Sequence, residues 1–498
     1  MIQNILVLGA GSAGLIAAIS IKRKIPRVNV HVVRSPSIGV IGVGEATTPN
    51  FPRHLFEYLG ISRKRFYALA SPTWKLGIKF LWGSRGRFDY TFDVQMDTHY
   101  PELSKPTGFY CDESFENASL GGALMRLDLA FPRQPNGAPE IHANHAFHIE
   151  NKKFVEILEQ VARELGVTFT DGKVTGSERG PSGISAIRLE DGQRLAADFF
   201  IDCSGFRSEL LGRTLAEPFV SFDKSLFCDR AVIGGWTRGK DEPILPYTTA
   251  ETMDCGWCWR IDHEALINRG YVYCSSFISD DEAAAEFHRK NPRVTDSPQI
   301  VKFRSGCYRR LWVDNVVALG NSSGFVEPLE STAIMLLCSH VQTLIDFFLH
   351  SDLQPTRTLQ DLYNEITYES WQDIRGFLSV HYKFNGMLQT PFWRQVRADA
   401  DVSSVGALLE FYRENGPTGF CRYRLPHTRS DFGLEGYLVM LVGNQVPYDT
   451  RGRIPLEEQT IWQRRKQSYV EQAKRGISSE EALSYVKHPG WKWHADPV

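Results

Sequence analysis

The sequence predicts an α/β fold in which a module with mixed sheets is joined to a mainly helical module. Near the N-terminus the apolar run Ile5–Leu8 leads into the glycine turn Gly9–Gly14, and an apolar helix pattern follows. A second junction of strand, turn and helix spans residues 316–337, and long helical periods dominate from about residue 345. Strands that alternate with helices, followed by helices alone, are typical of this fold class.

We expect the chain to divide near residue 345. Residues 1–345 would form the first module, with insertions on the substrate side around residues 75–140 and 220–300. Residues 346–498 would form the second module, which is mainly helical and completes the substrate site. A chain of 498 residues is long enough to bury a large core.

The composition excludes several classes of protein. The net charge is −2 and 23% of the residues are charged, with no basic stripe that would bind nucleic acid. No apolar run reaches about 18 residues, so we expect no membrane span, and Met1 leads directly into the first strand, so we expect no signal peptide. The nine cysteines form no disulfide framework, which predicts a reducing, cytoplasmic location.

The glycine turn at the N-terminus has the pattern of a dinucleotide-binding fold. In G-x-G-x-x-G the glycines permit a tight turn, close approach of the backbone to a pyrophosphate, and close packing of the helix on the strand. The pattern is specific here because a strand precedes it and a helix follows it. We predict cofactor contacts from Gly9, Gly11, Ser12, Ala13 and Gly14.

The second strand, Val28–Val33, is followed by Arg34, where such sites usually carry an acidic residue for the ribose. Arg34 could pair with a phosphate, as in NADP sites, or stack on the adenine and leave the ribose to another group. We favour stacking, and we expect weakened affinity for the cofactor.

A second glycine-rich loop spans residues 37–49, and a turn at residues 320–334 completes the predicted site. A strand that breaks at a glycine and reopens as a helix presents free backbone N–H groups. Flavin enzymes with a dinucleotide fold hold the pyrimidine edge of the flavin in this way. The turn also carries Glu327 and Glu330, which flavin binding alone does not require, so we predict chemistry at this turn.

Taken together, these segments resemble the flavin-dependent tryptophan halogenases over nearly the whole chain. The resemblance rests on Gly9–Gly14, Gly42–Thr47, Gly77–Phe80, Gly256–Asp262 and Phe325–Thr332. The fourth of these matches the family's W-x-W-x-I-P motif except at its last residue. The resemblance implies a two-dinucleotide-fold flavoprotein that binds FAD and either chloride or bromide. It also implies a small aromatic substrate and a separate NADH-dependent flavin reductase that supplies FADH2. A homodimer is compatible with the resemblance.

The resemblance also implies roles for particular residues. The remaining FAD contacts would come from Gly44, Glu45, Ala46, Thr47, Gly320 and Ile334. The halide would lie at the backbone amides of Thr332 and Ala333, at a helix N-terminus that favours an anion. Ser331, Trp257 and Trp259 would support the site, the tryptophan pair by shielding the flavin from acting as a monooxygenase. No metal is expected.

The expected chemistry centres on a lysine and a glutamate. The family's flavin, O2 and halide give hypohalous acid, which Lys79 would direct onto one carbon of an aromatic ring. Glu330 would stabilise the cationic ring and help to remove its proton. We expect Lys75 to be solvated. The competing interpretation of Lys79 is an ordinary strand lysine facing solvent.

The substrate stays open at this stage. Residues 97–102 bear little likeness to the segment that lines the indole pocket in relatives acting on free tryptophan, and residues 436–444 lack an obvious set of partners for an amino acid. Free tryptophan should therefore be a poorer substrate than indole, because burying an unpaired ammonium or carboxylate is costly. A flavin-dependent aromatic monooxygenase and a non-catalytic flavin-binding protein are the alternative functions.

Overall fold

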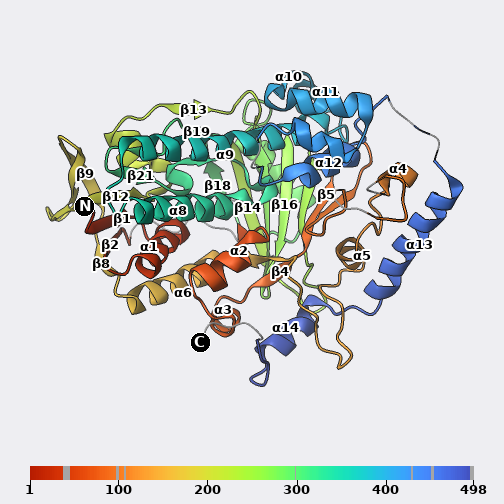
Figure 1. The fold of residues 1–498 in the computed structure, drawn as a ribbon, viewed down its shortest axis with the longest axis horizontal. Helices are drawn as coiled ribbons and strands as arrows, with labels where there is room; N and C mark the ends of the chain where they lie inside the picture. The colour runs from red at the N-terminus through yellow and green to blue at the C-terminus, as the bar shows by residue number, and fades with distance from the viewer. Residues whose placement is uncertain are drawn as a thin grey trace.

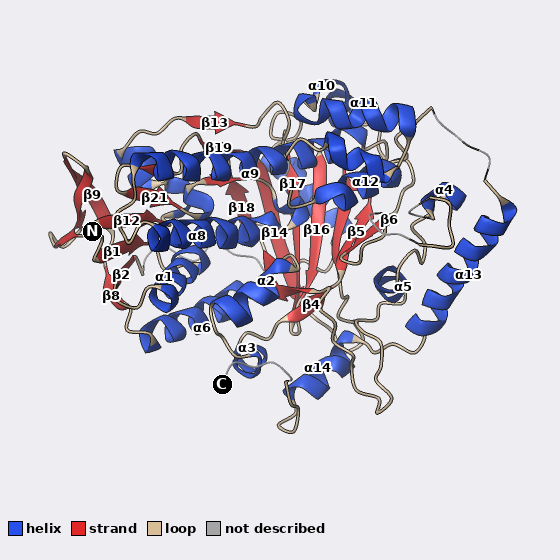
Figure 2. Ribbon diagram, in the orientation of Figure 1, coloured by secondary structure: helices blue, strands red, loops and turns tan. Residues whose placement is uncertain are grey.

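The computed structural model describes residues 1–36, 45–96, 100–105, 108–297, 299–427, 430–449, 452 and 454–493. Figure 1 shows the N-terminal strands at one end of the molecule, the long strands of a larger sheet at its centre, the helix Leu456–Ala473 along the opposite side, and the helix Ser479–Lys487 below the centre. Figure 2 shows helices packed beside both groups of strands, and strands without a covering helix at the N-terminal end.

The N-terminal sheet has six strands in the order β20-β21-β12-β1-β2-β8. β1 runs parallel to both neighbours, and β20 is an antiparallel edge strand. The strands are β1 (Asn4–Leu8), β2 (Asn29–Arg34), β8 (Thr168–Asp171), β12 (Phe199–Asp202), β20 (Trp312–Val313) and β21 (Val316–Ala318).

Both faces of this sheet are covered, so its strands are apolar at successive positions. Ile5 and Val7 belong to the cluster that contains the helices α1 (Ser12–Lys24), α6 (Asn151–Glu164) and α8 (Thr332–His350). Leu6 and Leu8 belong to a separate cluster with residues of β10 (Gly183–Leu189). The alternation follows the two-residue period of a strand, and it confirms the α/β architecture.

The second large sheet has seven strands in the order β18-β14-β17-β16-β15-β5-β6. Its pairs are antiparallel except for β15 and β5, which are parallel. The strands come almost entirely from the two predicted insertions. They are β5 (Gly77–Leu81), β6 (Phe88–Thr91), β14 (Arg230–Thr237), β15 (Thr248–Met253), β16 (Gly256–Asp262), β17 (Leu266–Tyr273) and β18 (Gln299–Lys302).

Three smaller sheets have three strands each, in the orders β3-β7-β4, β11-β10-β9 and β13-β19-β22. The first matters most for function because its strand β3 belongs to the described end of the second glycine-rich loop, residues 45–49. The remaining strands are β3 (Glu45–Ala46), β4 (Thr73–Lys75), β7 (Ala146–Ile149), β9 (Val174–Gly180), β11 (Arg194–Ala196), β13 (Phe219–Ser221), β19 (Gly306–Tyr308) and β22 (Gly324–Phe325).

Beyond residue 345 the described residues form helices and loops only. α9 (Arg357–Phe384) begins at Thr356, whose side chain accepts a hydrogen bond from the Leu359 amide, and it packs beside α8. Its last turns, beyond Phe377, enter the candidate site. The later helices are α10 (Pro391–Asp399), α11 (Gly406–Asn415), α12 (Gly433–Gly443), α13 (Leu456–Ala473) and α14 (Ser479–Lys487).

The shorter helices of the first part pack around the sheets. They are α2 (Asn50–Arg53), which continues into the π-turn His54–Tyr58, and α3 (Arg63–Leu69), α4 (Phe109–Asp112), α5 (Leu120–Arg126) and α7 (Asp280–Lys290). One hydrophobic cluster runs from Ile2 to Val486, so the two predicted modules share a core. The boundary near residue 345 stays a prediction.

Among the described residues, α8 is the one helix with the length and composition of a membrane span. Its most apolar window is 61% buried inside the fold, where it packs on α1 and α9. A buried central helix has the same apolar composition as a membrane span.

Candidate active site

The N-terminal glycine turn has the shape of a phosphate-binding turn. A Cβ at Gly9, which has φ +114°, would lie 2.3 Å from the Cys203 carbonyl oxygen, and one at Gly14 would lie 1.9 Å from the Gly9 carbonyl oxygen. A Cβ at Gly11 would meet nothing within 4 Å, so open space lies over this residue. The first turn of α1 carries no acidic side chain and its N-cap no side-chain hydrogen bond, which leaves its amides available for an anion. These residues fit a dinucleotide pyrophosphate.

Arg34 ends β2 and is held by two carboxylates. Its guanidinium makes ion pairs of 2.6 Å with Glu159 and with Asp171. Asp171 also raises the pKa of Arg34, so the charge is firmly retained. A guanidinium already neutralised by two carboxylates is poorly suited to recognise a phosphate. This geometry disfavours the NADP-like alternative and leaves stacking on adenine as a prediction.

The second glycine-rich loop reaches the centre of the molecule at Thr47. Gly44 lies outside the described residues, while Glu45 and Ala46 form β3 and pair with β7. Burial raises the pKa of Glu45 to about 7. The Thr47 hydroxyl bridges the amide and carbonyl of Phe147, at 2.8 and 3.0 Å, which fixes the loop against β7.

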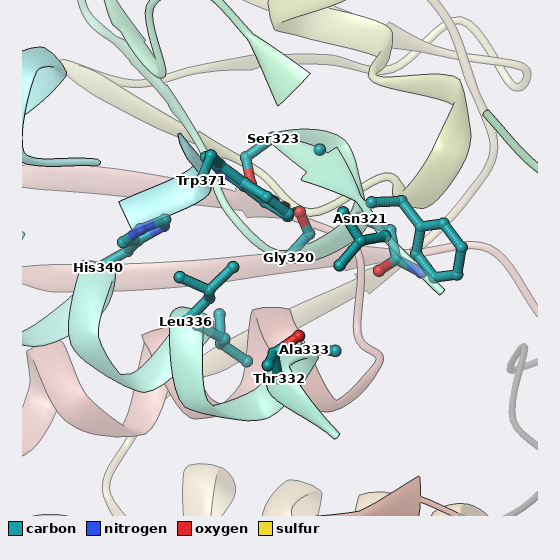
Figure 3. Close-up of a pocket in the computed structure, with 12 residues that line it drawn as sticks. Gly320, Asn321, Ser323, Thr332, Ala333, Leu336, His340 and Trp371 are labelled. Atoms are coloured by element: carbon teal, nitrogen blue, oxygen red, sulfur yellow. Dashed lines mark hydrogen bonds between the residues drawn. The ribbon is translucent and has the colours of Figure 1, made fainter. Parts of the chain in front are cut away.

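The turn at residues 320–334 faces the N-terminal glycine turn. Gly320 has φ +62°, and a Cβ there would lie 2.8 Å from the Ala13 side chain, so the two cofactor-binding turns are in close contact. Ser331 is left-handed, with φ 60°, and α8 begins at the next residue without a side-chain cap. Figure 3 shows Thr332 and Ala333 on the first turn of α8, facing Gly320, Asn321 and Ser323 across a narrow pocket. Ile334 instead packs in the core, 3% exposed.

Lys75 is buried at the end of β4, and the expectation that it is solvated is wrong. Its side chain is fully enclosed, and its Nζ donates to the Ser331 hydroxyl at 2.8 Å and to the Thr47 carbonyl at 3.2 Å. Burial lowers the pKa of Lys75 to about 7, and the neighbouring Glu330 carboxylate opposes that shift. Lys75 therefore joins the second glycine-rich loop, at Thr47, to the 320–334 turn through one amine.

Lys79 does not share the site with Glu330, contrary to the sequence-based expectation. Its amine contacts the Tyr247 hydroxyl and lies 3.8 Å from the Asp128 carboxylate. The adjacent residue Phe80 packs on His381, which binds Glu330, with ring centroids 5.6 Å apart. Because successive residues of a strand point to opposite faces, Lys79 points away from Glu330.

Glu330 is held by a histidine that the sequence did not reveal. His381, in the last turns of α9, places its Nε2 2.6 Å from Glu330 Oε1, and the two side chains are 0% and 3% exposed. Little in the sequence indicates this role, because a histidine in an apolar helix is more often a buried core residue whose hydrogen bonds are made within the fold.

The tryptophan pair lies on one face of β16. The rings of Trp257 and Trp259 are 6.1 Å apart, and both are buried. Trp257 Nε1 donates to Glu327 Oε2 at 2.7 Å, and the Tyr382 hydroxyl donates to the same oxygen. Burial raises the pKa of Glu327 to about 7. This network fixes Trp257 against the 320–334 turn.

Aromatic residues surround the Lys75 amine and Glu330. Lys75 Nζ lies 5.3 Å from the centre of the Phe92 ring. Tyr90 is close enough to Glu330 and Glu435 that both carboxylates, after burial, raise its pKa. Glu435 accepts hydrogen bonds from the backbone amides of Gln95 and Met96. A flat aromatic ring would find apolar walls here, with an amine and a carboxylate beside it.

Within the described residues, no group of three His, Cys, Asp or Glu side chains is arranged to hold a metal ion. The reactive groups of the site are instead an amine of lowered pKa, a buried carboxylate–imidazole pair, and backbone amides at a helix N-terminus. That set suits halide binding and electrophilic chemistry on an aromatic ring.

Comparisons with known proteins agree with this geometry. The family model for tryptophan halogenase matches residues 4–463. The tryptophan 7-halogenase KtzQ of Kutzneria sp. (strain 744) is 33% identical over 444 residues, which cover 84% of this chain and 82% of KtzQ.

Solved structures give the same result. MibH, a lanthipeptide tryptophan 5-halogenase, superposes with a TM-score of 0.88 at 37% identity, over 98% of this chain and 94% of MibH. Tar14, a tryptophan C-6 flavin-dependent halogenase (chlorinase) from taromycin biosynthesis, superposes with a TM-score of 0.87 at 25% identity, over 98% of this chain and all (100%) of Tar14. The chain belongs to the tryptophan halogenase family and is a flavin-dependent halogenase that uses FADH2 and halide to halogenate an aromatic substrate.

Proposed function

We propose that Lys75, and not Lys79, delivers the halogen to the substrate ring and that Glu330 accepts the ring proton. The observation that carries this proposal is the position of the Lys75 amine, held by Ser331 and Thr47 beside Glu330. Bound reduced flavin, with O2 and halide, supplies hypohalous acid. The neutral amine either forms an N–halogen bond with release of water or directs the acid by a hydrogen bond. The ring then takes the halogen and loses its proton to Glu330, and an equivalent proton returns to the lysine nitrogen, or to the hydroxide of the acid, so that the amine is restored and the oxygen leaves as water.

The halide is proposed to bind at the first turn of α8. The left-handed Ser331 turns the chain so that the amides of Thr332 and Ala333 begin the helix without a side-chain cap. Free N–H groups and the helix dipole favour an anion there. The same turn carries Ser331, which accepts a hydrogen bond from Lys75, so the bound halide would lie close to the Lys75 amine. The buried Trp257 and Trp259 would line the space between halide and amine and keep the flavin side apart from the substrate.

The lowered pKa of Lys75 makes a prediction for the pH dependence of halogenation. Only the neutral amine has a lone pair for an electrophilic halogen, and at an ordinary pKa near 10.4 roughly one lysine in a thousand is neutral at about pH 7.4. With a pKa of about 7 a large fraction is neutral. The rate of ring halogenation should therefore rise as the pH passes upward through about 7 and then level off.

This dependence is measured in single turnovers over a pH series, with hypohalous acid formation followed separately by a chemical trap. A Lys79→Ala variant is the matched control and should keep the same profile, because Lys79 lies on the other face of the sheet. A halogenation rate that stays flat around neutrality, while trapped hypohalous acid is also constant, would contradict the assignment.

The substrate is proposed to be an indole carried by a peptide. MibH, at 37% identity, is described as a lanthipeptide halogenase. The structure also has an open cleft of about 450 Å³ between α2 and α8. α2 follows closely after Thr47 in the sequence and α8 follows directly after Ser331, and these are the two residues that hold Lys75. The cleft is lined by Asn50, Phe51, Arg53, His54, Glu57, Tyr58, Met335, Cys338, Ser339, Gln342, Asp346 and Asp431.

A competition experiment tests this substrate class. Indole, free L-tryptophan and a short peptide with a central tryptophan are offered together with FAD, a flavin reductase and bromide. We expect kcat/KM to be highest for the peptide and lowest for free tryptophan, because burying an unpaired ammonium and carboxylate costs several kcal/mol. The highest kcat/KM for free tryptophan would overturn the proposal. A higher kcat/KM for indole than for the peptide would show that the cleft does not bind a peptide substrate.

We further propose a cytoplasmic enzyme that receives FADH2 from a separate NADH-dependent reductase and forms a homodimer. The family's chemistry supports the reductase, and the absence of a disulfide framework among the nine cysteines supports the reducing compartment. Light scattering of the purified protein measures the oligomeric state. An NADH oxidation assay without added reductase should show no turnover.

A further inference from the structure

His381 meets Glu330 in a place where neither side chain can reach water. The imidazole packs between the rings of Phe80 and Phe377, with centroid distances of 5.6 and 4.8 Å. Its Nε2 lies 2.6 Å from Glu330 Oε1. A carboxylate in such surroundings is costly unless it is paired, and His381 is its direct partner, with the Lys75 amine nearby.

The hydrogen bonds of the imidazole fix the position of one proton. His381 Nδ1 lies 3.0 Å from the Phe377 carbonyl oxygen, which can only accept a hydrogen bond, so Nδ1 carries a hydrogen. A neutral ring would then have a bare Nε2, and its lone pair would face a carboxylate oxygen at 2.6 Å. Two lone pairs at that distance repel each other. The pair must therefore hold a further proton between Nε2 and Oε1.

We propose that His381 is a positioning residue that keeps this shared proton during turnover and thereby makes Glu330 the acceptor of the ring proton. The inference rests on the role proposed above for Glu330. As positive charge develops on the halogenated ring, the shared proton settles on Nε2, and the full negative charge of the carboxylate faces the ring.

The proton balance closes between Glu330 and the halogen donor. The ring C–H bond breaks, its electron pair restores the aromatic ring, and the proton passes to the second oxygen of Glu330. Glu330 then gives up a proton to the Lys75 nitrogen that released the halogen, or to the hydroxide left when the acid reacts directly. The halogen has replaced the ring hydrogen, and the oxygen of the hypohalous acid leaves as water. Without His381, the charge of Glu330 would lose its direct hydrogen-bonding partner in apolar surroundings, and the carboxylate would be less well held to accept the ring proton.

The test uses the full-length enzyme with FAD, reductase and bromide, and compares His381→Gln and His381→Phe with the unaltered protein. Glutamine can donate a hydrogen bond to Glu330 but holds no transferable proton, whereas phenylalanine removes the bond. We expect kcat for brominated indole to fall about ten- to a hundred-fold in His381→Gln, and further in His381→Phe. Trapped hypobromous acid should form at an unchanged rate.

Ring-deuterated indole separates a role in proton removal from a structural role. We expect an isotope effect on kcat in His381→Gln that the unaltered enzyme lacks, because breaking the C–H bond becomes the slow step. Loss of activity without an isotope effect, or unchanged activity, would overturn the inference. Glu330→Gln is measured in parallel. If its kcat is unchanged, the proposed role of Glu330 is wrong. If Glu330→Gln is slow while His381→Gln is fully active, the role of Glu330 stands and only the inference about His381 is wrong. Should His381→Phe fail to fold, the glutamine variant decides.

Discussion

Lys75→Ala should abolish the halogenated product while flavin oxidation and formation of hypohalous acid continue. The amine is fully enclosed and held by Ser331 and Thr47, so no other described group can replace it at that point. Free hypohalous acid would then react without direction, and the loss of held geometry should lower ring halogenation about a thousand-fold or more. The measurement is product formation by mass spectrometry beside hypohalous acid captured by a chemical trap.

Lys79→Ala is the matched control, because it removes the same side chain four positions away in the sequence. Lys79 contacts Tyr247 and lies near the half-exposed Asp128 rather than Glu330, so its loss should have little effect on activity. If Lys79→Ala lost the product and Lys75→Ala retained it, the assignment would be reversed.

Glu330→Gln should lower kcat about a hundred-fold with a smaller effect on KM and on flavin affinity. The amide is close in shape to the carboxylate, so the local packing persists. It cannot hold the negative charge that a cationic ring requires, and this charge acts more strongly on the transition state than on the neutral substrate.

Steady-state kinetics with bromide and indole give the kcat and KM of this variant, and a flavin titration gives its affinity for FAD. Glu330 is buried, with 4% of its surface exposed. If a fall in flavin affinity accounts for the whole loss of activity, Glu330 acts by holding the 320–334 turn in place. An unchanged kcat would show that it has no part in the chemistry.

The elements with strong local signals were predictable from the sequence. The strand–glycine–helix unit at the N-terminus is encoded by consecutive residues, and the positive φ of Gly9 and the close approach of Gly14 need glycine at those positions. The 320–334 turn likewise carries its signal within a short segment. For these parts the pattern and the structure agree because the interactions are local.

The positions of the two lysines could not be predicted from the sequence, because they depend on the tertiary structure. Lys75 and Lys79 are four residues apart, and an unbroken strand would place both on one face. The chain instead leaves one sheet after Lys75, and Gly77 begins a strand of another sheet, with the Leu76 amide bonded to the Pro246 carbonyl between them. Which lysine contacts Ser331 depends on the strands that pair with β4 and β5. Those strands lie far away in the sequence.

His381 shows the same limit. Its partner Glu330 lies 51 positions away in the sequence, and the contact exists because α9 continues past Phe377 and packs beside α8. No pattern within α9 distinguishes this histidine from a buried core residue. The tryptophan pair was recognised as a motif, but its hydrogen bond to Glu327 appeared only in the structure.

One measurement tests the central claim most directly: the mass of the product formed from indole by the unaltered protein with FAD, a flavin reductase, NADH, O2 and bromide. The account predicts an indole that has gained one bromine in place of one hydrogen, recognisable by the paired bromine isotopes, and predicts its loss in Lys75→Ala. A product that has gained oxygen instead, or no product beside fully oxidised flavin, would contradict it.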